Sequence, residues 1–243
     1  MESIQRLKEL LAEARRQGDD IQVANLSYQA GDLYLEKGKW DLAHPLLDES
    51  YELCLRHGNP LGTALVAISL ATLFLRTDRP AEAEPLARQA QAFFRENRDI
   101  HRTASSSLLL GDTLWAQKRP GEALSAYQEA LGICESHGDG LGTATLLDRI
   151  ATMHRLLDQD DQALVHFQRA LGHWHKLAVP DREALTLTHL GDIHGRKGEV
   201  SRAASFHEHA LELYRNLKNH PATAATEAEL GRLRERIERQ GGE

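Results

Sequence analysis

The chain lacks the features that mark several large classes of protein. It has two cysteines in 243 residues, without a CxxC pair or a basic neighbourhood that would support a redox role. Its net charge is −7, with no block of like charges and no basic face, so a nucleic-acid partner is not expected. Apolar runs such as Leu108–Leu110 are too short for membrane insertion. The start, MESIQRLKELLAEARR, lacks the apolar core of a signal peptide, so we expect a cytoplasmic protein, provided that residue 1 is the native start.

Catalytic and metal-binding patterns are also missing. No HExxH, Walker A or GxSxG sequence occurs, and no carboxylate pair stands out among the surface acids. Histidine is abundant, but His173 and His175 are two residues apart, as are His207 and His209. On a helix that spacing points side chains about 200° apart, so neither pair can chelate one ion. We therefore predict no enzyme activity, no cofactor and no metal site.

What the chain does contain is a repeat with a step of 40 residues. A small residue recurs in the same local setting six times, and two further ladders keep the same step. The first ladder is Gly31, Ala71, Gly111, Ala151, Gly191 and Gly231; the second is Ala43, Ala83, Ala123, Ala163 and Ala203; the third is Ala90, Ala130, Ala170 and Ala210. A fixed period in this range is typical of a solenoid of stacked supersecondary units.

Residues 100–139 illustrate one unit. Apolar and small residues recur at helical spacings in Ile100–Lys118, and again in Glu122–Ser136. Arg119–Pro120–Gly121 breaks the pattern between them, and His137–Gly140 closes the unit. Each unit is thus predicted to be an antiparallel helix pair, A followed by B. The fold class predicted is all-α, a right-handed α-α superhelical solenoid of stacked antiparallel helix pairs with about twelve helices.

The same register extends to both ends, so we expect a single solenoid domain over 1–243. Its predicted parts are an N-terminal B-type helix at 1–17, five helix pairs at 20–57, 60–97, 100–137, 140–177 and 180–217, and a C-terminal capping helix at 220–240. The capping helix places Glu227 and Arg234 where other units hold packing residues, as a solvent-facing end requires. A further 80-residue step is visible, since HGNPLGTA at 57–64 recurs as HGDGLGTA at 137–144.

These patterns resemble the tetratricopeptide repeat family. Leu110–Gly111 followed by Leu114, then Ala123 with Tyr127 four residues later, matches its signature. The 40-residue period is similar to the longer repeats of polarity adaptors, kinesin light chains and bacterial regulators. HEAT-type repeats have a comparable length but lack this small-residue ladder.

Repeat position also predicts burial. Small residues are expected where helices A and B cross, so that the two backbones approach closely. Cys54 and Cys134 occupy one equivalent position, where we expect small buried hydrophobes too far apart for a disulfide. His154 and His194 share the aromatic packing position, so we expect both to be partly buried.

The resemblance implies that the A helices line a concave groove that holds ligands. Its apolar groups gather in the first half of the chain, and polar groups follow in the second half. The partner-binding positions implied are Asn25, Tyr28, Asp32, Leu35, Leu65, Ile68, Thr72, Leu75, Arg76, Leu108, Asp112, Trp115, Asp148, Arg155, Asp192 and Arg196. Packing against the neighbouring A helix is the competing interpretation for the apolar members.

We therefore expect a non-catalytic scaffold that binds a peptide or helix of a partner protein in the concave groove. One alternative is a ligand- or peptide-sensing regulatory protein, or the sensor fragment of a larger signalling protein. A further alternative is a self-assembling scaffold that forms a homo-oligomer through its terminal helices.

Overall fold

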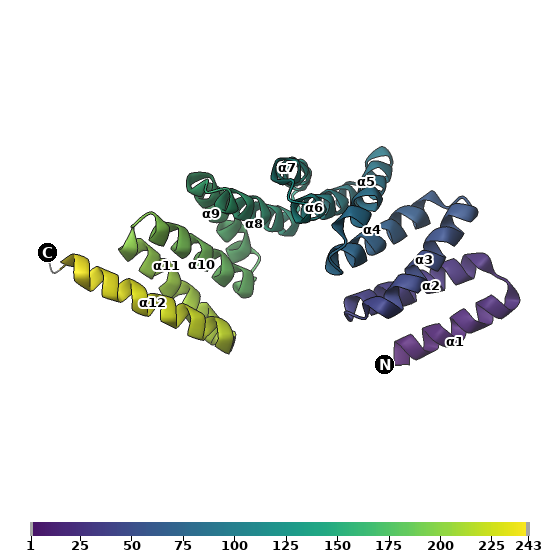
Figure 1. The fold of residues 1–243 in the computed structure, drawn as a ribbon, viewed down its shortest axis with the longest axis horizontal. Helices are drawn as coiled ribbons and strands as arrows, with labels where there is room; N and C mark the ends of the chain where they lie inside the picture. The colour runs from purple at the N-terminus through teal and green to yellow at the C-terminus, as the bar shows by residue number, and fades with distance from the viewer. Residues whose placement is uncertain (1, 242–243) are drawn as a thin grey trace. The chain divides into compact units, whose positions relative to one another are not determined.

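The computed structural model describes residues 2–241, and over this range the chain consists of helices and short turns, without a strand. Met1 and residues 242–243, which the predicted domain includes, lie outside the described residues. Twelve α-helices follow one another within these described residues (Figure 1), which confirms the predicted all-α fold of helix pairs. The helices are α1 (Glu2–Gln17), α2 (Asp20–Glu36), α3 (Trp40–Arg56), α4 (Pro60–Arg76), α5 (Pro80–Glu96), α6 (Ile100–Ala116), α7 (Pro120–Ser136), α8 (Gly140–Leu156), α9 (Asp160–Lys176), α10 (Pro180–Arg196), α11 (Val200–Asn216) and α12 (His220–Gly241).

The even-numbered helices are the A helices of the repeats, and the odd-numbered ones are the B helices. Most A helices begin with a side-chain cap. The side chains of Asp19, Asn59, Asp99 and Asp139, at 40-residue intervals, each accept a hydrogen bond from the backbone N–H three residues later, at 2.9–3.0 Å. Such caps satisfy N–H groups that the helix itself leaves unpaired. This explains the beginning of α2, α4, α6 and α8.

Every turn between helices reverses the chain in the same way. One residue per turn has a positive φ, and these residues recur every 20 positions. The following N–H donates to the carbonyl five residues earlier, for example Asp139 to Cys134 at 2.9 Å and Val179 to Trp174 at 3.2 Å. This is the Schellman arrangement that ends many helices. Glycine holds the position at 18, 38, 58, 138 and 198, whereas Asp78, Arg98, Lys118, Asp158, Ala178 and Lys218 adopt it despite their side chains.

The described chain divides into two compact units. The first extends to Ala130 and the second begins at Leu131, so the boundary lies within α7. Within the first unit, α2 packs on α3 and α4 on α5, and the A helices α2, α4 and α6 also contact one another in sequence. Within the second unit, α8 packs on α9, α10 on α11 and α11 on α12. One continuous solenoid over 1–243 remains a prediction.

Three glycines of the first ladder, Gly31, Gly111 and Gly191, each make room for one large side chain. A Cβ at Gly31 would lie 2.8 Å from Leu47, and a Cβ at Gly191 would lie 2.7 Å from His207, in each case a residue sixteen positions later on the B helix. The carbonyl oxygen of Ala43 is farther from a Cβ at Gly31, at 3.4 Å. Close approach of the two backbones stays a prediction, and the 3.4 Å contact with the Ala43 carbonyl oxygen is consistent with it. The limiting contact is with a side chain.

The buried positions predicted from the repeat are confirmed. Cys54 and Cys134 are both buried and unpaired with each other. His154 and His194 are 8% and 7% exposed. Their Nδ1 atoms lie 2.7 Å from Gln159 Oε1 and 2.9 Å from Glu199 Oε2, respectively. No described helix is long and apolar enough to cross a membrane.

Candidate functional site

The A-helix groove, meaning the partner-binding positions predicted on the A helices, begins in the first unit with a polar network. Ser69 on α4 donates a hydrogen bond to Asp32 on α2, with 2.8 Å between Oγ and Oδ1. Tyr28, half-buried beside them, also hydrogen-bonds Ser69. Burial and then the charge of Asp32 raise the pKa of the Tyr28 phenol. This network fixes α2 against α4, so Tyr28 and Asp32 have a structural role in addition to the predicted one.

The apolar positions of the groove differ in how much surface they offer. Leu35 is buried and therefore contributes little to an open groove. Leu65 and Ile68 are partly buried and pack against the core cluster of the first unit. Leu75 and Leu108 are half-buried, and Trp115 is 36% exposed. Leu35 is thus better interpreted as a packing residue. Leu65 and Ile68 also contribute to packing.

The remaining groove positions of the first unit are polar. Asn25 and Arg76 are exposed, and Thr72 donates to the carbonyl oxygen of Ile68 on its own helix at 2.8 Å. Asp112 accepts a hydrogen bond from the Tyr127 hydroxyl, with 2.5 Å between the oxygens. This hydrogen bond was not predicted from the sequence, although Asp112 and Tyr127 lie fifteen residues apart, a spacing that the repeat defines.

In the second unit, three predicted groove residues come together. Arg155 of α8 lines a cavity of about 390 Å³ with Asp192 and Arg196 of α10. His207 of α11 and Arg236 of α12 also line it. Asp192 Oδ1 lies 3.5 Å from His207 Nε2, again a pair fifteen residues apart. Residues from four helices therefore converge on one polar cavity.

Two residues that line this cavity, Arg155 and His207, have a buried polar atom without a hydrogen-bond partner. Among the described side chains, three buried atoms have none: Arg155 Nε, His189 Nδ1 and His207 Nδ1. Burial raises the pKa of Asp192, while His207 and Arg155 oppose the shift. Burial, followed by the positive charge of Arg155, lowers the pKa of His189 to about 4. Because an unpaired buried polar atom is costly, this cluster is suited to receive a polar group from outside the chain.

Asp148, the fourth groove position predicted in this unit, is occupied internally. Its carboxylate accepts hydrogen bonds from Trp174 Nε1 at 2.7 Å and from Thr186 Oγ1 at 3.1 Å. Burial raises its pKa to about 6. It does not line the cavity of Arg155, and its contacts join α8 to α9 and α10.

Sequence comparison identifies the family. The profile of the tetratricopeptide repeat matches residues 22–96, 60–136 and 102–176, which together cover more than half of the chain. The chain belongs to the tetratricopeptide repeat family. A second profile of the same repeat matches residues 186–221. No curated protein sequence matches the chain.

Solved structures share the tetratricopeptide fold. The chain is similar to BtubC (BKLC) from P. vanneervenii, with 21% identity over 88% of this chain and 91% of that one and a TM-score of 0.76. A Rap protein complexed with competence and sporulation factor shares 11% identity over 98% and 71% of the two chains, with a TM-score of 0.66. A kinesin light chain repeat protein from Podosopora anserina shares 14% identity over 81% and 98%, with a TM-score of 0.68.

The opposite face of the repeats, formed by the B helices, carries charged bridges that the sequence analysis missed. Arg15 of α1 pairs with Glu49 of α3 at 2.6 Å. Arg95 of α5 pairs in the same way with Glu129 of α7, and Arg169 of α9 with Glu135 of α7. Each pair joins neighbouring B helices across 34 residues, at the same two positions of the repeat. Aligning the repeats at these positions would have revealed them.

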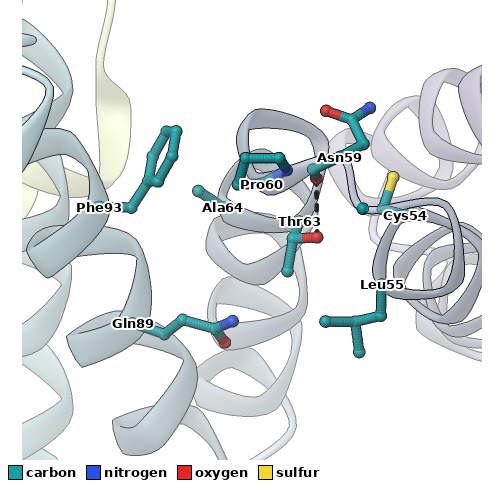
Figure 2. A pocket seen from close by; sticks show the side chains of 9 residues that line it. Cys54, Leu55, Asn59, Pro60, Thr63, Ala64, Gln89 and Phe93 are labelled. Atoms are coloured by element: carbon teal, nitrogen blue, oxygen red, sulfur yellow. Dashed lines mark hydrogen bonds between the residues drawn. The ribbon is translucent and has the colours of Figure 1, made fainter.

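The bridge is absent at two described places, and an apolar cleft lies at each. In the first unit the two positions hold Leu55 and Gln89, and a cleft of about 280 Å³ opens there. Figure 2 shows Gln89 and Phe93 facing Cys54 and Leu55 across α4. In the second unit the positions hold His175 and His209, which line a cleft of about 710 Å³.

Among the described residues, no group of three potential ligands could hold a metal ion.

Proposed function

We propose that the chain is a non-catalytic scaffold that captures a peptide or helix of a partner protein on its A-helix groove. The observation that carries this proposal is the convergence of Arg155, Asp192 and Arg196 on one cavity whose surroundings contain unpartnered buried polar atoms. The Rap structure with competence and sporulation factor shows that a protein of this fold takes a ligand of its own. Polar groups from a bound peptide would satisfy the atoms that the chain leaves unpaired.

Arg155 is the residue expected to contact the partner most directly in the second unit. Its Nε is buried without a hydrogen-bond partner, and it lines the cavity together with Asp192 and Glu229. A guanidinium in that state binds a carboxylate through charge-assisted hydrogen bonds. The proposed partner therefore carries an acidic side chain where it crosses α8 and α10.

The first unit supplies the apolar contact area of the proposed binding groove. Trp115 is exposed, and Leu75 and Leu108 are half-buried along the same A-helix face. Tryptophan is enriched among the residues that dominate binding energy at protein interfaces. A large apolar side chain of the partner is expected to contact Leu75 and Trp115.

Affinity capture from the source-cell lysate tests both units separately. One variant, Leu75→Glu with Trp115→Ala, alters the first unit, and Arg155→Met alters the second while retaining the aliphatic stem. Arg169→Met, on the B-helix face, is the matched control because it removes an exposed guanidinium away from the groove. Each groove variant is expected to lose the captured protein with unchanged helical content by circular dichroism. Capture that survives both groove variants would contradict the proposal.

A ligand-sensing regulatory protein is the second candidate, because a cavity of about 390 Å³ lies in the size range of small-ligand sites. Unlike a scaffold, a regulator of this kind would need another chain or domain to carry out the response to the ligand. Homo-oligomerisation through the terminal helices remains a separate prediction, checked by light scattering at high protein concentration.

A further inference from the structure

The cleft in the second unit lies among α9, α10 and α11 and has an apolar interior. Leu187 and Leu190 of α10 are buried and form its floor. Leu171, Phe206 and Leu213 line it from the flanking B helices, and all three pack partly buried against the core of this unit. Its volume of about 710 Å³ is within the range typical of small-ligand sites, about 300–1,000 Å³.

Two departures from the repeat, at positions 175 and 209, help to open this cleft, and a glycine at 172, which position 132 shares, leaves it uncovered. His175 and His209 replace the charged bridge that closes the equivalent place between other B helices, such as Arg95 with Glu129. Gly172 leaves a gap in one wall, since a Cβ added there would meet no atom within 4 Å. The cleft is therefore open because this repeat lacks the side chains that would cover it.

A third departure gives the cleft its charge. Glu183 occupies the repeat position that holds Thr63, Thr103, Thr143 and Thr223 in other units. At Thr63 and Thr103 the hydroxyl donates to the carbonyl oxygen four residues earlier, so it stays at its own helix. Glu183 instead lines the cleft with a side chain that is 19% exposed, and its Oε1 lies 3.0 Å from His175 Nδ1.

The basic groups that line this cleft are the imidazoles of His175 and His209, and His175 lies beside Glu183. Glu212 lines it as well, and none of the described lining residues is a lysine or an arginine. A largely buried carboxylate is stabilised by a cation that also hydrogen-bonds it. An apolar interior next to such a carboxylate is complementary to a molecule with an apolar body and one positive end.

We propose that the cleft among α9, α10 and α11 binds a small hydrophobic amine, with its ammonium group at Glu183 and its apolar body against Leu187, Leu190 and Phe206. This binding does not depend on the proposed capture of a peptide, because the cleft is lined by the B helices and by the side of α10 that faces them. The ammonium group would donate to the Glu183 carboxylate.

Matched probes of one shape test the proposal. The full chain is titrated with 4-phenylbutylamine, 4-phenylbutan-1-ol and 4-phenylbutyrate, and binding is followed by the NMR signals of the His175 and His209 rings, assigned with single variants. The amine is expected to bind about tenfold more tightly than the alcohol, and the carboxylate more weakly than both, because only the amine forms a charge-assisted hydrogen bond. Equal binding of amine and alcohol would overturn the proposal.

Three variants locate the binding. Glu183→Gln keeps the shape of the side chain and should bring the amine to within about threefold of the alcohol. Gly172→Leu should fill the cleft without a clash and abolish binding of both probes, since no atom lies within 4 Å of its Cβ. Gly132→Leu, at the equivalent open position one repeat earlier, should leave binding unchanged. Unchanged binding by the Gly172→Leu variant would overturn the proposal.

A titration with a peptide tests the alternative occupant, a basic helix. A synthetic amphipathic helix of leucine and lysine is titrated under the same conditions. If this peptide shifts the His175 and His209 signals and the amine does not, the cleft docks a basic helix and the proposal is wrong. If the amine alone shifts them, the proposal is supported.

Discussion

The ring of Tyr127 lies against the backbone of Gly111, so closely that a Cβ at position 111 would be 2.4 Å from Tyr127 Cε1. The ring has little freedom to withdraw, because its side chain is 1% exposed and its hydroxyl hydrogen-bonds Asp112 at 2.5 Å. A glycine that recurs as part of a 40-residue ladder is thus required here by one specific aromatic contact.

Replacing Gly111 by alanine should therefore destabilise the first unit. The overpacking is expected to lower the free energy of unfolding by about 1–3 kcal/mol, measured by urea denaturation. Gly231 is the control from the same ladder, because a Cβ there would meet no atom within 4 Å. Gly231→Ala should stabilise the chain by up to about 1 kcal/mol through helix propensity. Equal effects of the two substitutions would contradict this explanation.

The turns give a second pair of matched substitutions. Ala178 has a φ of 53° and Gly138 a φ of 69°, at equivalent places in consecutive repeats of the second unit. A side chain in this left-handed region costs about 1 kcal/mol. Ala178→Gly should therefore raise the free energy of unfolding by about that amount, and Gly138→Ala should lower it similarly. Thermal and urea denaturation check both signs, and a loss of stability in Ala178→Gly would contradict the assignment of this turn.

The helices were predictable because the pattern of apolar and small residues recurs along the chain. Local sequence signals at several helix ends support that pattern. Leucines, small residues and turns recur every 40 positions, and a local cap such as Asn59 or Asp139 reinforces the start of an A helix. The left-handed turn residue was predictable only where glycine marks it. At Lys118 or Ala178 the conformation follows from the constant turn length and has no local sequence signal.

The candidate sites were predictable only in part. Groove positions could be transferred by register, and Arg155, Asp192 and Arg196 do come together in one cavity. Register does not reveal side-chain rotamers, so the engagement of Asp148 by Trp174 could not be read from a spacing of 26 residues. The cleft at His175 and His209 was missed for a different reason. It depends on positions that depart from the repeat, whereas the ladders were built from positions that keep it.

Asp148 should make stability depend on pH in a specific direction. Its pKa is raised from 3.8 to about 6 in the folded chain, chiefly by burial, so the folded state binds this proton more tightly than the unfolded state. The stabilisation is fully present below pH 3.8 and is lost as the pH rises through 6. Relative to Asp148→Asn, the wild type should lose about 2–3 kcal/mol of unfolding free energy between pH 4 and pH 7. A difference that stays constant with pH, measured by urea denaturation, would exclude this contribution.

His189 should act in the opposite direction over the same range. Burial and then Arg155 lower its pKa from 6.5 to about 4, so its contribution to stability is present above pH 6.5 and is lost as the pH falls through 4. Relative to His189→Leu, which places here the residue found at the equivalent Leu109, the wild type should lose about 2–3 kcal/mol between pH 7 and pH 4. The terms of Asp148 and His189 oppose each other and therefore partly cancel in the wild type. Each term becomes visible when the wild type is compared with its own variant, and the double variant should lack both terms by the same urea measurement.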